Sequence, residues 1–438
     1  MDRSREPNVV FVLNILLYAA LAVFGVLGAC AIPAARHDLA LSRLATMYSL
    51  TEYGSFYLDA PEGREPNPFA SNTVDKVLAR GREISSKPPI LPLMMTGEYV
   101  VLRSVFGLDL KNEADRGKVM RVLTFTFVWV PFFLTVLLFD RTVALFDVDP
   151  LIRWIVTLFL AFGTQLWGYS LSINNHIPGT FFLVLCLYLA LGLIYRKWAP
   201  APWRFALFGL SAGLVLTVEM PASIWAAIAG FCLMYHFPRK TLGWAALAVA
   251  APVAVHAGVM MHVTGSPFPV QVHPEMYLFE NSYWRHPTGI DGLNEPKGTY
   301  LFHMTFGRCG VFIMYPVLLA GLLSPVRYFL RKPLRYHRPL LLGALAERFA
   351  RFPLRAGVAL AALAVILGGC ATESYRANEE GRKAMERGDY GLAVEKFLEV
   401  QVARPDDPAV ALNLAAAYAA AGRETEAIAA ARRAKPSC

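Results

Sequence analysis

Long apolar runs of about 18–25 residues, separated by charged breaks, dominate the first three quarters of the chain. This length fits helices that cross a bilayer, and the runs lack the period-two alternation of barrel strands. The predicted spans are residues 8–32, 122–139, 152–173, 181–195, 205–218, 222–237, 242–263 and 309–323. The pattern predicts an all-α fold, a polytopic transmembrane helical bundle.

Two long polar segments interrupt the apolar pattern, residues 34–119 after the first span and residues 264–308 after the seventh. Short connections between other spans carry clustered Lys and Arg, most densely over residues 327–338. Because basic residues collect in cytoplasmic loops, we place these short basic connections inside. Both long segments are then outer loops, and the first of them is large enough to hold a site.

The first outer loop contains an apolar segment, residues 90–106, that Glu98 and Arg103 interrupt. We interpret it as a helix that lies along the membrane interface. The alternative is a tilted span whose polar group faces the protein interior.

The composition agrees with a membrane protein. Of 438 residues, 55% are hydrophobic and 17% are charged, whereas about 25% charged is usual for soluble domains. The formal net charge of +9 lies largely in the short loops, which indicates membrane topology and argues against a nucleic-acid partner. The six cysteines are scattered without a zinc-ligand spacing.

The chain changes character after residue 338. Residues 339–369 form a basic linker and a short Ala/Val/Leu run, followed directly by Cys370. Basic residues, a short apolar run and small residues before a cysteine resemble a bacterial lipoprotein signal. This resemblance implies that Cys370 is lipidated after cleavage. The alternative is a short span that carries the remaining chain outward.

Residues 370–438 resemble tetratricopeptide repeats, which are helical hairpins with a period of about 34 residues. The positions that carry the resemblance are small, aromatic or helix-ending: Gly381, Ala393, Phe397, Pro405, Ala415, Tyr418, Gly422 and Ala427. Small residues let two helices of one repeat approach closely, and the aromatic fills the gap. We predict a small α-helical tail on the outer side that binds a protein partner.

A run of polar residues and prolines, Ser85-Ser86-Lys87-Pro88-Pro89, precedes the apolar segment at residue 90. A first span, an outer loop with an early acidic residue and a Lys-Pro-Pro before an apolar helix resemble the GT-C glycosyltransferases. The likeness is to the bacterial branch related to protein O-mannosyltransferases and lipid A aminoarabinose transferases, and it covers residues 1–338. Members of that family usually continue with several more spans.

The resemblance implies a multi-pass enzyme of the bacterial inner membrane that moves a sugar from a polyprenyl-phosphate donor to an acceptor at the extracytoplasmic face. By resemblance, Lys87 holds the lipid phosphate with help from Arg43, and Arg308 is a further contact. A basic side chain at headgroup level suits this anion, although Lys87 as an interfacial anchor is the alternative. Inverting transfer needs a carboxylate to take the acceptor proton. Asp38 is the predicted base, and Asp75 is the second candidate.

Four polar residues near the outer ends of other spans are predicted to bind substrate: Asn174, Asn175, His176 and Glu219. They suit hydrogen bonds to sugar hydroxyls, but helix capping is an equally good explanation.

No cofactor is firmly implied. Some relatives place a metal-binding acid directly before Lys-Pro-Pro, but Ser86 occupies that position here, so we predict no metal ligands. A divalent metal stays open because His176, His273 and His286 are all predicted on the outer side. The competing function is an inactive, truncated core that anchors the repeat tail as a protein-binding module.

Overall fold

The protein is described from a computed structural model, which covers residues 8–31, 38–146, 148–195, 197–280, 282–285, 296–307, 310–314, 380–385, 387–403 and 408–433. The described residues form two compact units, residues 8–285 and residues 296–433.

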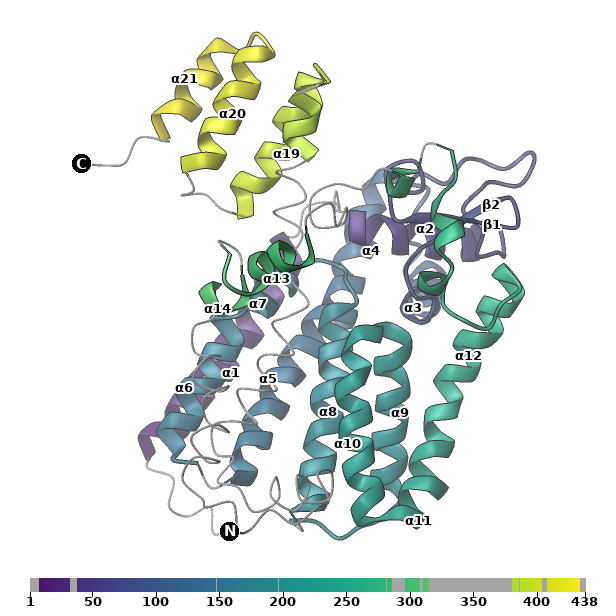
Figure 1. Cartoon of the computed structure of the whole chain (residues 1–438), viewed down its shortest axis with the longest axis vertical. Helices are drawn as coiled ribbons and strands as arrows, with labels where there is room; N and C mark the ends of the chain where they lie inside the picture. Colours follow the sequence, from purple (N-terminus) through teal and green to yellow (C-terminus); the bar gives the residue numbers. More distant parts are fainter. Residues whose placement is uncertain are drawn as a thin grey trace. The chain divides into compact units, whose positions relative to one another are not determined.

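The first unit consists mainly of helices, as predicted (Figure 1). Its α-helices are α1 (Asn8–Ala31), α2 (Asp38–Glu52), α3 (Ile90–Phe106), α4 (Glu113–Thr124), α5 (Val130–Val143), α6 (Pro150–Phe162), α7 (Gln165–Tyr169), α8 (His176–Ile194), α9 (Pro202–Val218), α10 (Ser223–His236), α11 (Pro238–Lys240) and α12 (Leu247–Thr264). Shorter helical segments are η2 (Phe125–Trp129), η3 (Ala144–Phe146), η4 (Met220–Ala222), η5 (Thr241–Ala246), η6 (Val270–Val272), η7 (Pro274–Tyr277) and η8 (Tyr283–Arg285).

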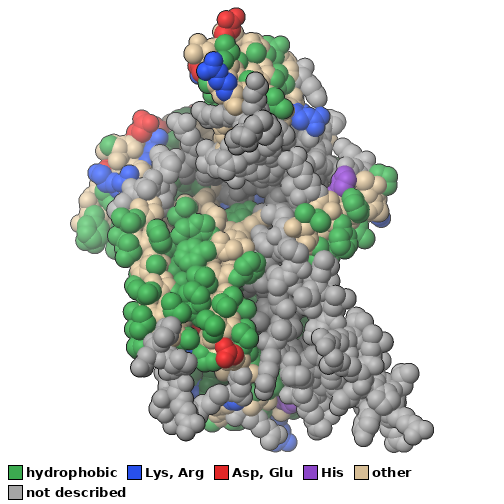
Figure 2. All heavy atoms as spheres, turned by 90° about the vertical axis from the view of Figure 1, so that its left-hand side faces the viewer, with side chains coloured by type: hydrophobic (Ala, Val, Ile, Leu, Met, Phe, Trp, Pro, Cys, Tyr) green, Lys and Arg blue, Asp and Glu red, His purple; other side chains and the backbone are tan. Residues whose placement is uncertain are grey.

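Four helices within the described residues are long and apolar enough to cross a membrane: Val10–Gly28, Glu113–Phe146, His176–Ile194 and Pro238–Thr264. The shorter apolar helices α6, α9 and α10 belong to the same group of helices (Figure 1). Hydrophobic side chains cover the flank of the first unit where α1 and α6 lie (Figure 2). These apolar helices indicate a membrane protein.

The predicted continuous span over residues 152–173 is wrong. Helix α6 ends at Phe162, and the short helix α7 begins at Gln165. The Thr164 hydroxyl accepts a hydrogen bond from Leu166 N at 3.2 Å, so it caps a new helix at this point. Threonine at a helix N-terminus favours such a start, because its oxygen satisfies a free backbone N–H.

A two-stranded antiparallel hairpin, which the all-α prediction missed, interrupts the polar segment between α2 and α3. Strand β1 (Lys76–Ala79) pairs with β2 (Arg82–Ser85). The connecting residues Arg80 and Gly81 have φ values of 52° and 77°. Positive φ at both central positions is the geometry of the two-residue hairpin turn.

Helices α9 and α12 pack closely along their length. A Cβ at Gly209 would lie 2.1 Å from the Ala245 carbonyl oxygen, and one at Gly213 would lie 2.4 Å from Pro252 Cγ. These two glycines, four residues apart on α9, therefore permit the approach of η5 and α12. Small residues commonly serve this purpose between membrane helices.

Helix α3 has one face in the protein core and one face exposed. Its buried side chains include Met95 and Tyr99, which pack with Leu44 and Met47 of α2. Its exposed hydrophobic side chains are Leu93, Met94, Val100, Val101, Val105 and Phe106. With 17 residues, α3 is shorter than the roughly 20 that a spanning helix needs.

The second unit contains α13 (Lys297–Thr305), α14 (Val311–Met314), α19 (Tyr390–Ala403), α20 (Pro408–Ala420) and α21 (Glu424–Arg433). Helices α19, α20 and α21 enclose a small apolar core around Phe397. Gly388 and Gly422 both have φ of 75° and stand before the second helix of a pair, with a spacing of about 34 residues.

Candidate functional site

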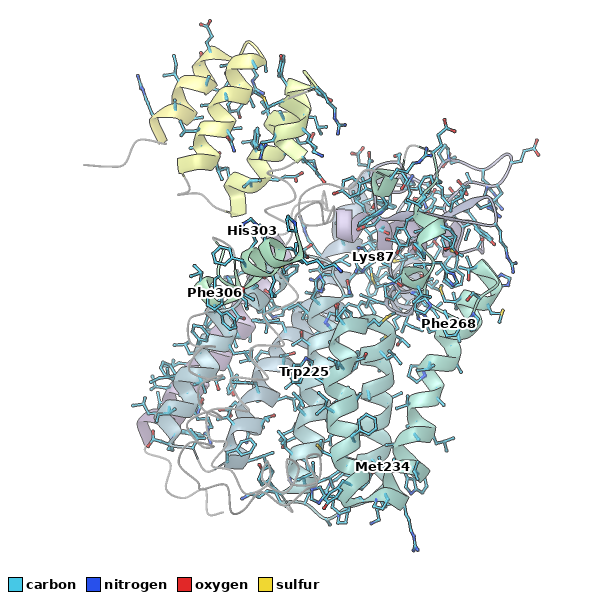
Figure 3. The ribbon with its side chains drawn as sticks, in the orientation of Figure 1. Lys87, Trp225, Met234, Phe268, His303 and Phe306 are labelled. Carbon is cyan, nitrogen blue, oxygen red and sulfur yellow. The ribbon has the colours of Figure 1, made fainter. Side chains whose placement is uncertain are left out.

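Lys87 and Asp75 form an ion pair at the base of the hairpin. Asp75 directly precedes β1, and Lys87 lies just beyond β2, so the pairing of Lys76 with Ser85 brings the two together. Lys87 Nζ lies 3.0 Å from Asp75 Oδ1, and their side chains are 22% and 1% exposed. Lys87 lies beyond the upper end of α10, the helix that carries Trp225 and Met234 (Figure 3).

Helix α2 packs against the backbone on both sides of this ion pair. Ser42 Oγ donates a hydrogen bond to the Asp75 carbonyl oxygen at 2.9 Å and lies 2.6 Å from Ser85 Oγ. Ser86 N donates to the same carbonyl at 2.9 Å. These bonds join α2 to both ends of the hairpin and so fix the spacing of the ion pair.

The segment after α12 packs against the hairpin and its ion pair. Gln271 Nε2 donates to the Ser86 carbonyl oxygen at 2.8 Å. Burial raises the pKa of Tyr277 to about 12, with a further contribution from the Asp75 carboxylate. Apart from the ion pair with Lys87, neither Asp75 carboxylate oxygen has a hydrogen-bond partner among the described residues. The buried Asp75 charge therefore depends on Lys87.

A second polar cluster joins Arg43, Asn175, Glu219 and His176. Arg43 Nη2, in a side chain that is 1% exposed, donates to Asn175 Oδ1, and Asn175 Nδ2 donates to Glu219 Oε2. The same Glu219 oxygen lies 2.9 Å from His176 Nδ1. The Asn175 amide thus bridges a guanidinium and a carboxylate through hydrogen bonds to charged groups, which are stronger than neutral ones.

The ends of α8 and α9 position this second cluster. His176 is the first residue of α8, and Glu219 directly follows α9. A Cβ at Gly179 would lie 2.4 Å from Glu219 Cβ, so the glycine lets Glu219 approach the first turn of α8. Free N–H groups at a helix N-terminus favour a nearby carboxylate.

Asn174 has a different function from its neighbour Asn175. Its side chain is buried; Nδ2 donates to the carbonyl oxygens of Tyr169 and Ser172, and Oδ1 accepts from Ile177 N at 3.0 Å. These bonds close the turn before α8. The alternatives for Asn174 were sugar binding and helix capping, and capping explains its contacts within the protein.

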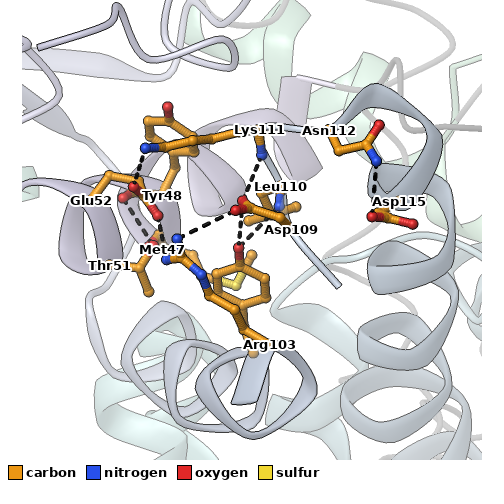
Figure 4. A network of polar contacts seen from close by, with 11 residues as sticks. Met47, Tyr48, Thr51, Glu52, Arg103, Asp109, Leu110, Lys111, Asn112 and Asp115 are labelled. Atoms are coloured by element: carbon orange, nitrogen blue, oxygen red, sulfur yellow. Dashed lines mark hydrogen bonds and ion pairs between the residues drawn. The ribbon is translucent and has the colours of Figure 1, made fainter. Parts of the chain in front are cut away.

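A third polar network ties the C-terminal ends of α2 and α3 together (Figure 4). Glu52 Oε1 lies 2.6 Å from Arg103 Nη1, and Glu52 Oε2 lies 2.8 Å from Lys111 Nζ. Arg103 also pairs with Asp109 at 3.3 Å. The Glu52 contacts raise the pKa of Lys111. Arg103 therefore forms a structural ion pair that links α3 to α2.

An open pocket of about 440 Å³ adjoins the third network. Its lining residues come from α2 and α3: Leu50, Thr51, Thr96, Val100, Arg103 and Ser104.

The other predicted site residues have varied positions. Asp38 is the first residue of α2, four positions before Ser42; its side chain lies outside the described set. His273 Nδ1 lies 3.2 Å from Glu275 Oε1. The predicted sites at His286, Arg308 and Cys370 lie outside the described residues. Among the described residues, no group of three or more His, Cys, Asp or Glu could hold a metal ion.

Ser42, Gln271 and Tyr277 were not among the predicted site residues. Ser42 could have been predicted, because it directly precedes Arg43, a predicted site residue. The contacts of Gln271 and Tyr277 connect segments that are almost 200 residues apart, and no local pattern predicts them.

Comparison with protein family models, with curated proteins and with solved structures gave no match to this chain. The function is therefore inferred from the residues of the chain and their geometry.

Proposed function

We propose that the protein is an integral-membrane glycosyltransferase, similar to the GT-C enzymes, that takes its sugar from a polyprenyl-phosphate donor. The observation that carries the proposal is the ion pair between Lys87 and Asp75, located directly before α3. The proposed setting is the bacterial inner membrane, with the first unit multi-pass and the site at its extracytoplasmic face.

Lys87 is suited to bind an anion. Its ammonium group has three N–H donors, and the contact with Asp75 engages one of them. The side chain is 22% exposed, so the remaining donors are accessible to a phosphate oxygen. The N-terminus of α3, which begins three residues later, adds a dipole that favours negative charge.

Helix α3 supplies a surface for the lipid part of the donor. Its exposed hydrophobic side chains begin at Leu93, six residues after Lys87, and continue to Phe106. A helix with such a face binds at the boundary between headgroups and acyl chains. A lipid-linked sugar phosphate combines these two chemistries, an anion and a long apolar chain.

The carboxylate of Asp75 suits a positioning function. It is buried and paired with Lys87, so an acceptor hydroxyl has no direct access to it. We therefore assign Asp75 to the orientation of Lys87, in place of the base function that the sequence suggested as one option. Asp38 stays a candidate base from the family resemblance.

The proposal is tested by transfer of labelled sugar in membranes that contain the full chain. The probes are polyprenyl-phosphate-linked mannose, glucose and aminoarabinose, with endogenous membrane components as acceptors. We expect Lys87→Ala to lower transfer at least 100-fold. Lys76→Ala is the matched control, because Lys76 pairs with Glu83 at 2.8 Å on the same hairpin. Equal activity of the wild type and Lys87→Ala would contradict the proposal.

We further propose that the second unit carries tetratricopeptide-like repeats that bind a protein. The support is the recurrence of a left-handed glycine before the second helix of each pair, together with Gly381, where a Cβ would lie 2.6 Å from the Phe397 ring. If the first unit transfers no sugar, the favoured function of that unit is to anchor the repeat module in the membrane. A pull-down with full-length protein in detergent, compared with a variant lacking residues 380–433, tests it.

A further inference from the structure

We infer that His176, oriented by Glu219, is the general base that takes the proton from the acceptor hydroxyl. This inference rests on the proposed glycosyltransferase function and assigns the base function to His176 in place of Asp38, the residue that the family resemblance implies. It follows from the geometry of the second polar cluster.

The two nitrogens of the His176 ring have different surroundings. Nδ1 lies 2.9 Å from Glu219 Oε2, and a carboxylate accepts hydrogen bonds but donates none when ionised. Nδ1 therefore carries the proton, and in the neutral ring Nε2 has the free lone pair. Nε2 has no hydrogen-bond partner among the described residues, and the side chain is 21% exposed. A substrate hydroxyl can therefore approach the basic nitrogen.

Glu219 is held in place by Asn175 and by its close approach to the first turn of α8. Asn175 Nδ2 donates to the same carboxylate oxygen, and Arg43 in turn donates to Asn175. Gly179 leaves the room that the Glu219 side chain occupies. A carboxylate fixed in this way orients the imidazole and stabilises the imidazolium that forms when it accepts a proton, which is the logic of histidine–carboxylate pairs in hydrolases.

Within the described part of the chain, Tyr169 and Arg43 are two further titratable groups that lie around the His176–Glu219 pair. Tyr169 of α7 contacts the ring, with the two ring centroids 5.1 Å apart, and Arg43 of α2 reaches the pair through Asn175. Glu219 is the carboxylate in direct contact.

Helix α2 connects this base to the phosphate-binding lysine. Ser42 bonds to the backbone beside the Lys87–Asp75 pair, and the next residue, Arg43, bonds into the His176 cluster. Two adjacent residues of one helix therefore hold both clusters. Both clusters thus contact the second turn of α2, which supports a site that takes the donor phosphate at Lys87 and the acceptor hydroxyl at His176.

The chemical step forms one bond, breaks one bond and moves one proton. The acceptor oxygen forms a bond to the anomeric carbon while its proton moves to His176 Nε2. The bond between the anomeric carbon and the phosphate oxygen breaks, and its electron pair leaves with the polyprenyl phosphate. Lys87 stabilises the resulting anion, and His176 then releases its proton to water. Positioned general bases contribute about 10²- to 10⁴-fold to such steps.

The test measures sugar transfer against pH for the full chain in membranes, with the same three donors. We expect His176→Gln to lower kcat at least 100-fold with little change in KM for the donor. A general base acts only when it is deprotonated, so the wild-type rate should fall toward acid pH, and this dependence should be absent from His176→Gln. Glu219→Gln should lower kcat and change the pH profile, because it removes the charge that stabilises the imidazolium.

His273→Gln is the matched control, because His273 also has Nδ1 near a glutamate, at 3.2 Å from Glu275. It should keep the wild-type rate and pH profile. Gly179→Ala provides a second variant if His176→Gln fails to fold, since it displaces Glu219 without removing a titratable group. It should lower kcat in the same direction as Glu219→Gln.

The outcomes separate the two proposals. Transfer that requires Lys87 but is unchanged in rate and pH profile by His176→Gln overturns the base assignment and leaves the glycosyltransferase proposal intact. No transfer by the wild type from any of the three donors overturns both. Loss of transfer in both Lys87→Ala and His176→Gln, with the pH dependence lost only in the latter, is the result we expect.

Discussion

Lys87 Nζ lies 3.0 Å from Asp75 Oδ1. The two residues flank the β1–β2 hairpin, whose strands run in opposite directions and so bring its two ends together. The Asp75 side chain is almost completely buried. An ion pair of this kind is sensitive to the loss of one partner, because the remaining charge is left uncompensated in a medium of low polarity.

Lys87→Ala should therefore destabilise the protein by about 3 kcal/mol. Adding Asp75→Asn should recover most of this loss, because no buried charge remains. Lys76→Ala is the control: its partner Glu83 is 27% exposed, so the loss should stay below about 1 kcal/mol. Thermal unfolding in detergent gives the order of stabilities. A double variant no more stable than Lys87→Ala alone would contradict this account.

The packing of Tyr277 near Asp75 predicts a pH dependence. Burial and the Asp75 charge favour the neutral phenol and raise its pKa from 10.0 to about 12. A group whose pKa is raised on folding contributes its stability below the unfolded pKa and loses it as pH rises to the folded value. Between pH 10 and 12, the free energy of unfolding should thus fall by about 2–3 kcal/mol.

The measurement is an absorbance titration of tyrosinate in the wild type and in Tyr277→Phe. The difference between the two curves should have its midpoint near pH 12. Asp75→Asn should lower that midpoint, since it removes the charge that opposes ionisation. A difference curve centred at pH 10 in the folded protein would show that Tyr277 is exposed.

The sequence predicted the components of the candidate site better than their contacts. Asn175, His176 and Glu219 were predicted as polar residues at the outer ends of spans, where apolar patterning makes them conspicuous, and Arg43 was predicted from the family resemblance. Their contacts depend on the meeting of the ends of α8 and α9 and on the hydrogen bond from Arg43 of α2 to Asn175, and no local signal encodes either. Equally, the pairing of Lys87 with Asp75 depends on the hairpin.

Adjacent residues illustrate the same limit. Asn174 and Asn175 have identical side chains, yet the first closes a turn and the second bridges Arg43 and Glu219. The length of apolar runs predicted the long apolar helices, because it is a property of the local sequence. It missed the break at Thr164, where a single capping hydroxyl divides an otherwise apolar run.

The close packing of α9 predicts a contrast between two glycines. Gly209→Ala should destabilise the first unit by about 1–3 kcal/mol, because the new methyl group would overlap the backbone oxygen of Ala245, which a rotamer change cannot move. Gly258→Ala on α12 is the control, since a Cβ there meets no atom within 4 Å. That change should be neutral or stabilising by up to about 1 kcal/mol, as alanine favours helix. Thermal unfolding in detergent should separate the two, and equal midpoints would contradict the packing.

The second unit offers a comparable pair of glycines with opposite backbone requirements. Gly422 has φ of 75°, which costs an L-residue with a side chain about 1–2 kcal/mol, so Gly422→Ala should loosen α20 and α21. Gly391 lies within α19, where alanine is favoured by about 1 kcal/mol and the nearest atom to its Cβ would be Asp389 Oδ1 at 3.8 Å. Hydrogen exchange of amides in residues 390–433 of the full chain should therefore accelerate in Gly422→Ala and slow in Gly391→Ala. Unchanged exchange in Gly422→Ala would show that this turn does not need its left-handed glycine.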